Sequence, residues 1–126
     1  MSLFHAIALV DHQSAQVFQI DSEQVLESKV HMHTYSTQQH VSEVRSQHEF
    51  FGEVCVAFEG ITEVLVVGGH TGLADFRYYV EKHRPLTAKQ IVEYQVVDHP
   101  TDNQLVALGR KFFSEYDKTT GRHLPS

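Results

Sequence analysis

Hydrophobic residues in the first part of the chain recur with the period of two that is typical of β-strands. Residues 5–10 are apolar on both alternations, and residues 61–67 form an almost unbroken apolar run. Both patterns predict central strands that are buried on two faces. Residues 15–20 predict a further strand, and residues 24–32 alternate between apolar and polar side chains as an edge strand does. The inward side of that edge strand is predicted to carry Leu26, Val30 and Met32.

From residue 41 the apolar positions follow the helical period instead. One apolar stripe predicts a helix of about five turns that ends at Gly60. The members of this stripe are Val41, Val44, His48, Phe51, Cys55 and Phe58. A second helix is predicted over residues 71–83, because Pro85 pushes Arg84 out of helical geometry. A strand follows over residues 91–97.

The last helix is predicted to begin at Thr101, which forms a capping-box pattern with Gln104. The element order is then β-β-β-α-β-α-β-α. Because crossovers between parallel strands are right-handed, the predicted sheet order is 3-2-1-4-5 with strand 2 antiparallel to strand 1. The expected fold class is α/β, with three α/β/α layers around a mixed five-stranded sheet. One domain is expected over residues 1–118, followed by a flexible tail over residues 119–126. The predicted buried side chains of the last two helices are Leu73, Phe76, Val80, Leu105, Leu108 and Phe112.

Composition narrows the class of protein. The chain has 126 residues, of which 41% are hydrophobic and 21% charged, as in a soluble globular domain. It has no apolar run of the ~20 residues that span a membrane, and its first residues lack the features of a signal peptide. A single cysteine, Cys55, excludes an internal disulfide. We therefore expect a cytoplasmic protein without a membrane partner.

Charge is distributed unevenly. The net charge is −6, which argues against DNA as a partner. Residues 1–60 carry eight acidic and two basic side chains, whereas residues 61–126 carry eight of each. A basic surface on the second half is compatible with these numbers.

Three stretches of the sequence resemble one family. They are residues 5–21 (HAIALVDHQSAQVFQID), residues 64–72 (VLVVGGHTG) and, most specifically, residues 97–113 (VDHPTDNQLVALGRKFF). With the predicted element order, they resemble the middle domain of archaeal and eukaryotic class-1 peptide chain release factors. They also resemble the small bacterial translational machinery proteins that share this domain. The resemblance covers residues 4–113 and implies a ribonuclease H-like architecture, a translation-related function and the ribosome or ribosomal RNA as partner.

Two features depart from that family. Release factors carry a Gly-Gly-Gln tip on a long loop before the first helix, and this tip places the hydrolytic water at the peptidyl-transferase centre. Here the corresponding connection is residues 34–39, which contain no glycine, and Gln13-Ser14-Ala15 in the first hairpin lacks both glycines of the tip. Relatives also often carry a lysine where Leu73 stands. Both departures argue against an enzyme, so we assign no catalytic residue, metal ligand or cofactor.

The predicted topology brings polar residues to one edge of the sheet, at the carboxyl ends of strands 1, 4 and 5. We call this set the rim: Asp11, His12, Gly69, His70, Thr71, Asp98 and His99. Histidines and carboxylates placed together could bind a divalent metal or perform acid–base chemistry. Ordinary turn and capping roles are the simpler explanation. Residues 68–72 could likewise cradle an anion through backbone N–H groups, or form a tight turn that needs glycine.

Three isolated histidines and the cysteine have plain structural explanations. His31 and His33 share a strand face, as metal pairs do, but Glu27 and Lys29 on the same face favour a solvated edge. His48 interrupts an apolar stripe, which predicts a partly buried, hydrogen-bonded ring. Cys55 on that stripe is predicted to be a small core residue.

A nuclease would need several carboxylates converging on metal ions. Asp11 is one candidate, and Glu43 or Glu49 is a second. The central strand offers none, because Val66, Val67 and Gly68 occupy its end. The sequence therefore predicts that this active site is absent.

Four basic residues cluster around the second helix and its exit. They are Arg77, Lys82, Arg84 and Lys89. They predict either a surface that docks on ribosomal RNA or a solvated face balanced by Asp75 and Glu81. The leading hypothesis is a non-enzymatic protein that associates with the ribosome or RNA. The alternatives are a small metal- or anion-dependent hydrolase that uses His12, His70, Asp98 and His99, and a homo-oligomeric regulatory domain that binds a small ligand.

Overall fold

A computed structural model describes residues 3–12, 14–20, 25–31 and 43–120. The strands are β1 (Leu3–Val10), β2 (Ser14–Ile20), β3 (Val25–His31), β4 (Ile61–Gly68) and β5 (Ile91–Val96). The helices are α1 (Glu43–Ala57), α2 (His70–His83), α3 (Pro85–Gln90) and α4 (Asp102–Thr120). All predicted elements are present, and α3 is the only additional one among the described residues.

The strands form one sheet in the order β3-β2-β1-β4-β5. β1 pairs antiparallel with β2 and parallel with β4, and β4 pairs parallel with β5. These pairings confirm the predicted mixed five-stranded α/β fold. β4 lies between two parallel neighbours, and residues 64–67 are fully buried, as their unbroken apolar run predicts.

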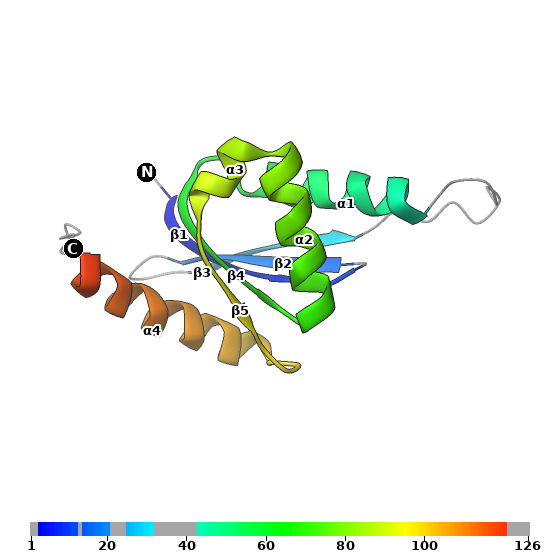
Figure 1. Cartoon of the computed structure of the whole chain (residues 1–126). Helices are drawn as coiled ribbons and strands as arrows, with labels where there is room; N and C mark the ends of the chain where they lie inside the picture. Colours follow the sequence, from blue (N-terminus) through cyan, green and yellow to red (C-terminus); the bar gives the residue numbers. More distant parts are fainter. Residues whose placement is uncertain (1–2, 13, 21–24, 32–42, 121–126) are drawn as a thin grey trace.

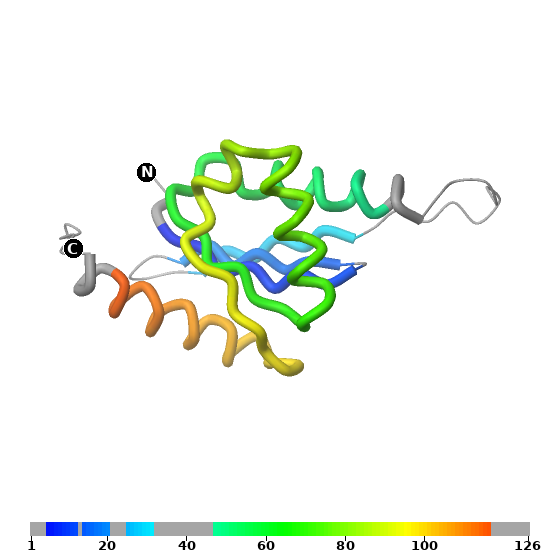
Figure 2. The backbone as a smooth tube through the Cα atoms, in the orientation of Figure 1, coloured from blue at the N-terminus to red at the C-terminus, as the bar shows by residue number. Residues whose placement is uncertain are grey.

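Helices cover both faces of the sheet (Figure 1). α1 and α2 cover one face, where alternate residues of β1 and β4 such as Ala8 and Val66 pack against Phe51 and Phe76. α4 covers the other face, where Ile7 and Leu65 pack against Leu105 and Phe113. Figure 2 follows the chain from α3 along β5 to α4, so β5 carries the chain from one layer to the other. Within the described residues, no helix is both long enough and apolar enough to cross a membrane.

The edge strand β3 is less buried than its alternation predicts. Leu26 was expected inward but is 50% exposed, so that prediction is wrong. β3 contributes to the cores near its two ends, because Val30 packs on the α1 side and Val25 on the α4 side. Leu26 faces a part of the sheet that these contacts do not cover. Met32 lies outside the described residues.

The apolar face of α1 is wider than the predicted stripe. Phe51, Cys55 and Phe58 are buried as expected, and Phe50 and Val54 are buried as well. His48 lies at the margin of this face and is exposed, so the prediction of a partly buried ring is wrong. Val41 and the side chain of Val44 lie outside what the structure describes.

The helix boundaries follow the predicted local chemistry. Arg84 has φ −134° and ψ 65°, outside helical geometry, as expected for a residue before proline. Pro85 then starts α3, because proline is favoured at the first position of a helix. At α4, Thr101 N–H donates to Gln104 Oε1 at 2.8 Å, and Gln104 N–H donates to Thr101 Oγ1 at 3.1 Å. This reciprocal pair confirms the capping box.

The buried stripe of α4 is broader than predicted. Leu105 is fully buried, Leu108 and Phe112 are half-buried, and Phe113 is 3% exposed. α4 continues to Thr120, two residues into the segment predicted as a tail, and residues 121–126 lie outside the description.

Candidate functional site

The carboxyl ends of β1, β4 and β5 meet at one edge of the sheet, as the topology predicts. Val97 N–H donates to the carbonyl of Gly68 at 2.9 Å, which joins the ends of β4 and β5. A Cβ atom on Gly68 would overlap the carbonyl oxygen of Val10, so glycine is needed there for close approach of two backbones. A Cβ atom on Gly72 would lie 3.4 Å from the Cα atom of Asp11. The first turn of α2 therefore rests on the β1–β2 turn.

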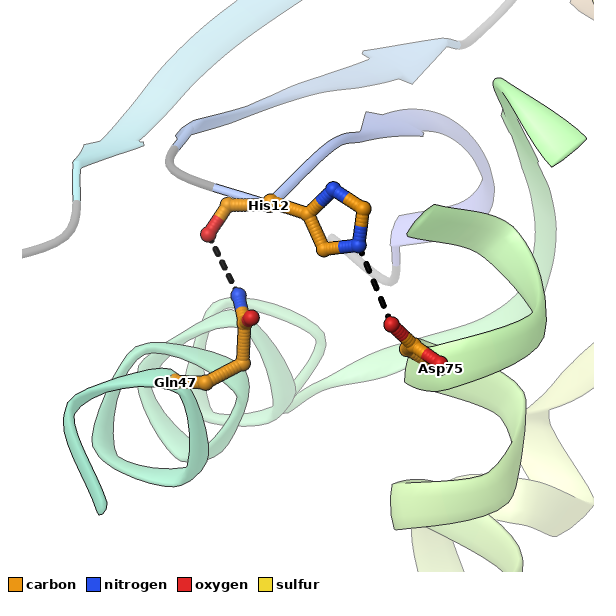
Figure 3. A network of polar contacts seen from close by, with 3 residues as sticks. All are labelled: His12, Gln47 and Asp75. Atoms are coloured by element: carbon orange, nitrogen blue, oxygen red, sulfur yellow. Dashed lines mark hydrogen bonds and ion pairs between the residues drawn. The ribbon is translucent and has the colours of Figure 1, made fainter. Parts of the chain in front are cut away.

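A polar network holds the β1–β2 turn between two helices (Figure 3). His12 Nε2 lies 3.0 Å from Asp75 Oδ2 of α2. The side-chain amide of Gln47 on α1 donates to the backbone carbonyl of His12. The side chains of His12 and Asp75 are 43% and 56% exposed, so solvent screens the pair and its contribution to stability is small, ~0–1 kcal/mol. The main effect of the network is to fix the position of the turn.

The sequence indicated His12 as a candidate functional residue, but no sequence pattern indicated the two residues that contact it. Gln47 and Asp75 are 35 and 63 residues away along the chain. Asp75 had been assigned only as a counter-charge to the basic residues. Their contact with His12 follows from how α1 and α2 pack over the end of β1, which the hydrophobic pattern does not encode.

Asp11 directly precedes His12, whereas the remaining rim residues form no hydrogen bond or ion pair with this network in the described part of the chain. His70 and Thr71 are exposed in the first turn of α2, and Gly69 caps that helix in an extended conformation without a side-chain hydrogen bond. Asp98 and His99 have almost fully exposed side chains that approach each other to 3.7 Å. His99 has φ +44°, in the left-handed region, as is common in tight turns. Across the described ranges, no three His, Cys, Asp or Glu side chains come together as a metal site requires.

The structure divides the four basic residues into two pairs. Arg77 Nε lies 3.0 Å from Glu81 Oε2, and its guanidinium carbon lies 5.0 Å from the centre of the Tyr94 ring. Burial, reinforced by Glu81, raises the pKa of Tyr94 to about 12. Tyr94 therefore stays neutral and presents a half-buried ring for Arg77 to cover.

Arg84 is exposed but also contacts another side chain. Its guanidinium donates to the Tyr79 hydroxyl, and this hydrogen bond raises the pKa of Arg84 above its ordinary value. A Cβ atom on Gly52 would lie 3.1 Å from Arg84 Nη2 and 3.3 Å from Tyr79 Oη. The bare glycine on α1 thus leaves room for Arg84 and Tyr79 to meet, so Arg84 joins α1 to the α2–α3 junction.

Lys82 and Lys89 are exposed, as Arg77 and Arg84 also are. Lys82 Nζ lies 5.6 Å from the centre of the Tyr78 ring, which is itself 67% exposed. Lys89 lies in the last turn of α3. Neither lysine forms an ion pair or hydrogen bond with a side chain in the described part of the chain. We call Lys82 and Lys89, with Tyr78, the α2–α3 surface.

The remaining candidate residues are Cys55 and the isolated histidines His48, His31 and His33. Cys55 is 3% exposed, and burial raises its pKa to about 11, as expected for a core thiol. The ring of His48 packs 5.1 Å from Tyr79 and 5.4 Å from His83, measured between ring centres. His31 is exposed at the end of β3, and His33 lies outside the described residues.

The structure describes the surroundings of only part of the set of nuclease candidates. Val66 and Val67 are fully buried at the end of β4. Glu49 is exposed on α1, and the side chain of Glu43 lies outside the description. The connection at residues 34–39, where release factors carry their tip, is likewise outside the described residues.

Comparison with solved structures identifies proteins that share this fold. No protein-family model and no curated protein sequence matches the chain. Pelota from Archaeoglobus fulgidus matches 92% of the chain with a TM-score of 0.59 and 21% identity. The archaeal translation termination factor aRF1 matches 92% with a TM-score of 0.56 and 15% identity. A further archaeal protein matches 93% with a TM-score of 0.54 and 12% identity.

The matched region is only part of each of these proteins. The chain spans 35% of the Pelota chain, 39% of aRF1 and 40% of the third protein. At such low identities the likeness concerns the fold. The chain therefore shares the fold of one portion of Pelota and of aRF1, which confirms the resemblance to release factors at the level of the fold.

Proposed function

We propose that the chain is a non-enzymatic, translation-related protein of the cytoplasm that docks on ribosomal RNA through the α2–α3 surface. The observation that carries the proposal is the shared fold with Pelota and aRF1 over 92% of the chain. Residues 1–126 contain no Gly-Gly-Gln tripeptide, so we infer that the protein does not position a hydrolytic water for peptide release.

Charge supports the choice of surface. Lys82 and Lys89 are exposed, and neither is neutralised by a neighbouring carboxylate among the described residues. Lysine ammonium groups in this state bind phosphates and release counterions when they do so. Arg77 and Arg84 are exposed in the same region, but each already contacts another side chain, Glu81 or Tyr79. We therefore assign the phosphate contacts to the two lysines.

The test is co-sedimentation with purified ribosomes over a range of salt concentrations. We expect binding to weaken steeply with salt, with each phosphate contact adding roughly 0.9 to the log–log slope for duplex nucleic acid. The variant Lys82→Glu/Lys89→Glu should lose most binding at low salt and show a slope smaller by about two. Arg77 and Arg84 are left unchanged, because replacing them would disturb their contacts with Tyr94 and Tyr79.

A matched control comes from α4 on the opposite face of the sheet. Arg110 and Lys111 are both exposed there, and Arg110→Glu/Lys111→Glu carries the same change in net charge. This control should bind as the wild type does. The proposal fails if the wild type does not pellet with ribosomes at low salt, or if both double variants bind equally.

A further inference from the structure

Tyr78 is the exposed aromatic side chain of α2. Its neighbour Tyr79 is 7% exposed and packs with Phe51, whereas Tyr78 is 67% exposed on the outer side of the helix. Tyr94, which also borders α2, is half-buried and covered by Arg77. The core therefore does not account for an aromatic ring at position 78.

Tyr78 is paired with one of the two available lysines. Lys82 follows it by four residues, which places both side chains on the same side of the helix. The ammonium lies 5.6 Å from the ring centre and so occupies one face of the ring. The high exposure of Tyr78 leaves the rest of the ring accessible to solvent. The result is an open aromatic surface next to a cation that no carboxylate neutralises among the described residues.

This combination fits one form of RNA better than another. Unpaired bases stack on exposed aromatic rings while nearby cations bind the adjoining phosphates. In a double helix the base faces are stacked on each other, so a ring such as Tyr78 gains little from a duplex. On the basis of the proposed function, we infer that α2 binds an unpaired nucleotide, whose base stacks on Tyr78 and whose phosphate contacts Lys82.

The inference is tested with two fluorescein-labelled RNAs in an anisotropy titration of the full chain. One is a single-stranded octanucleotide of mixed sequence, and the other presents that sequence within the stem of a hairpin. We expect wild-type protein to prefer the single strand. Tyr78→Ala should weaken single-strand binding by about 5- to 150-fold, the range for loss of one base–aromatic stack, and leave stem binding unchanged.

Three further variants give the controls. Tyr78→Phe keeps the ring and should bind the single strand as the wild type does. Leu86→Ala removes an exposed apolar side chain, 75% exposed on α3, and should have no effect on binding to either RNA. Lys82→Gln should reduce the salt slope for the single strand by about 0.7. Alanine, phenylalanine and glutamine are all compatible with an exposed helix position, so folding is retained.

The outcomes separate this inference from the proposed function. Equal single-strand binding by Tyr78→Ala and wild type would overturn the inference, as would a preference for the stem or binding to neither RNA. If ribosome binding still depends on Lys82 and Lys89 in those cases, the proposed function stands without an unpaired-base contact. Loss of single-strand binding in Tyr78→Ala, with Tyr78→Phe unaffected, supports the inference whether or not ribosomes are bound.

Discussion

Replacing Gly68 by alanine tests how closely the ends of β1 and β4 are packed. The added Cβ would overlap the carbonyl oxygen of Val10, which is fully buried. Because the obstacle is the backbone of the neighbouring strand, no side-chain rotation can relieve the overlap. Overpacking in a core costs ~1–3 kcal/mol, and a backbone obstacle places the expected cost near the upper end, about 3 kcal/mol.

The adjacent glycine is a matched control. Gly69 has φ −70° and ψ 158°, which any residue can adopt, and an added Cβ would have no atom within 4 Å. Gly69→Ala should therefore change stability by less than about 1 kcal/mol, because the lower entropy of the unfolded chain is offset by the loss of glycine at the N-cap of α2. The two substitutions are chemically identical and differ by one position, so a much larger cost at position 68 reports the close approach.

Urea unfolding followed by far-ultraviolet circular dichroism measures both variants. In thermal unfolding, about 3 kcal/mol corresponds to a Tm lower by roughly 10 °C for a domain of this size. A free energy of unfolding for Gly68→Ala within about 1 kcal/mol of the wild-type value would contradict the close packing of the two strand ends. The same conclusion follows if Gly69→Ala is as destabilising as Gly68→Ala.

Three other predictions concern Arg84 and Cys55 at the junction of α1, α2 and α3. Arg84→Ala removes the hydrogen bond to Tyr79 and should lower the free energy of unfolding in urea by about 1 kcal/mol. Lys82→Ala is the control and should change it by less than about 0.5 kcal/mol. Equal effects of the two substitutions would refute the structural role of Arg84. The pKa of Cys55 is raised from 9.0 to about 11, so iodoacetamide at pH 8 should alkylate the folded protein at least about a hundredfold more slowly than the unfolded chain. Rapid labelling of the native protein would contradict the burial of Cys55. Above pH 9 the thiol of the unfolded chain loses its proton before the thiol of the folded protein does. The free energy of unfolding should therefore fall between pH 9 and about 11.

The fold was predictable because a strand buried on both faces is apolar at almost every position, and this pattern is visible in the sequence. The apolar run at residues 61–67 identified the central strand, and right-handed crossovers then determined its neighbours. The helix α3 was missed because Pro85 ends α2 and also begins the next helix. Leu26 was misplaced because the period of two gives the face of a strand but not how far a helix covers it.

The candidate site was only partly predictable, because its contacts are tertiary. The sequence placed the rim residues at one edge, but it could not show that the His12 ring contacts Asp75. It also could not show that the backbone carbonyl of His12 accepts a hydrogen bond from Gln47. The four basic residues are also indistinguishable in the sequence. Only the folded structure shows that Arg84 forms a hydrogen bond with Tyr79, whereas Lys89 has no such partner among the described residues.

The central claim is that the α2–α3 surface faces ribosomal RNA, and site-specific cross-linking tests it most directly. A photoreactive phenylalanine analogue is placed at Leu86 on α3, which makes none of the proposed phosphate contacts, or, as the control, at Lys111 on α4. Both positions are exposed, and α3 and α4 lie on opposite sides of the sheet. After irradiation on ribosomes at low salt, the proposal predicts covalent adducts with ribosomal RNA from position 86 and none above background from position 111. No RNA adduct from position 86, or equal adducts from both positions, would contradict it.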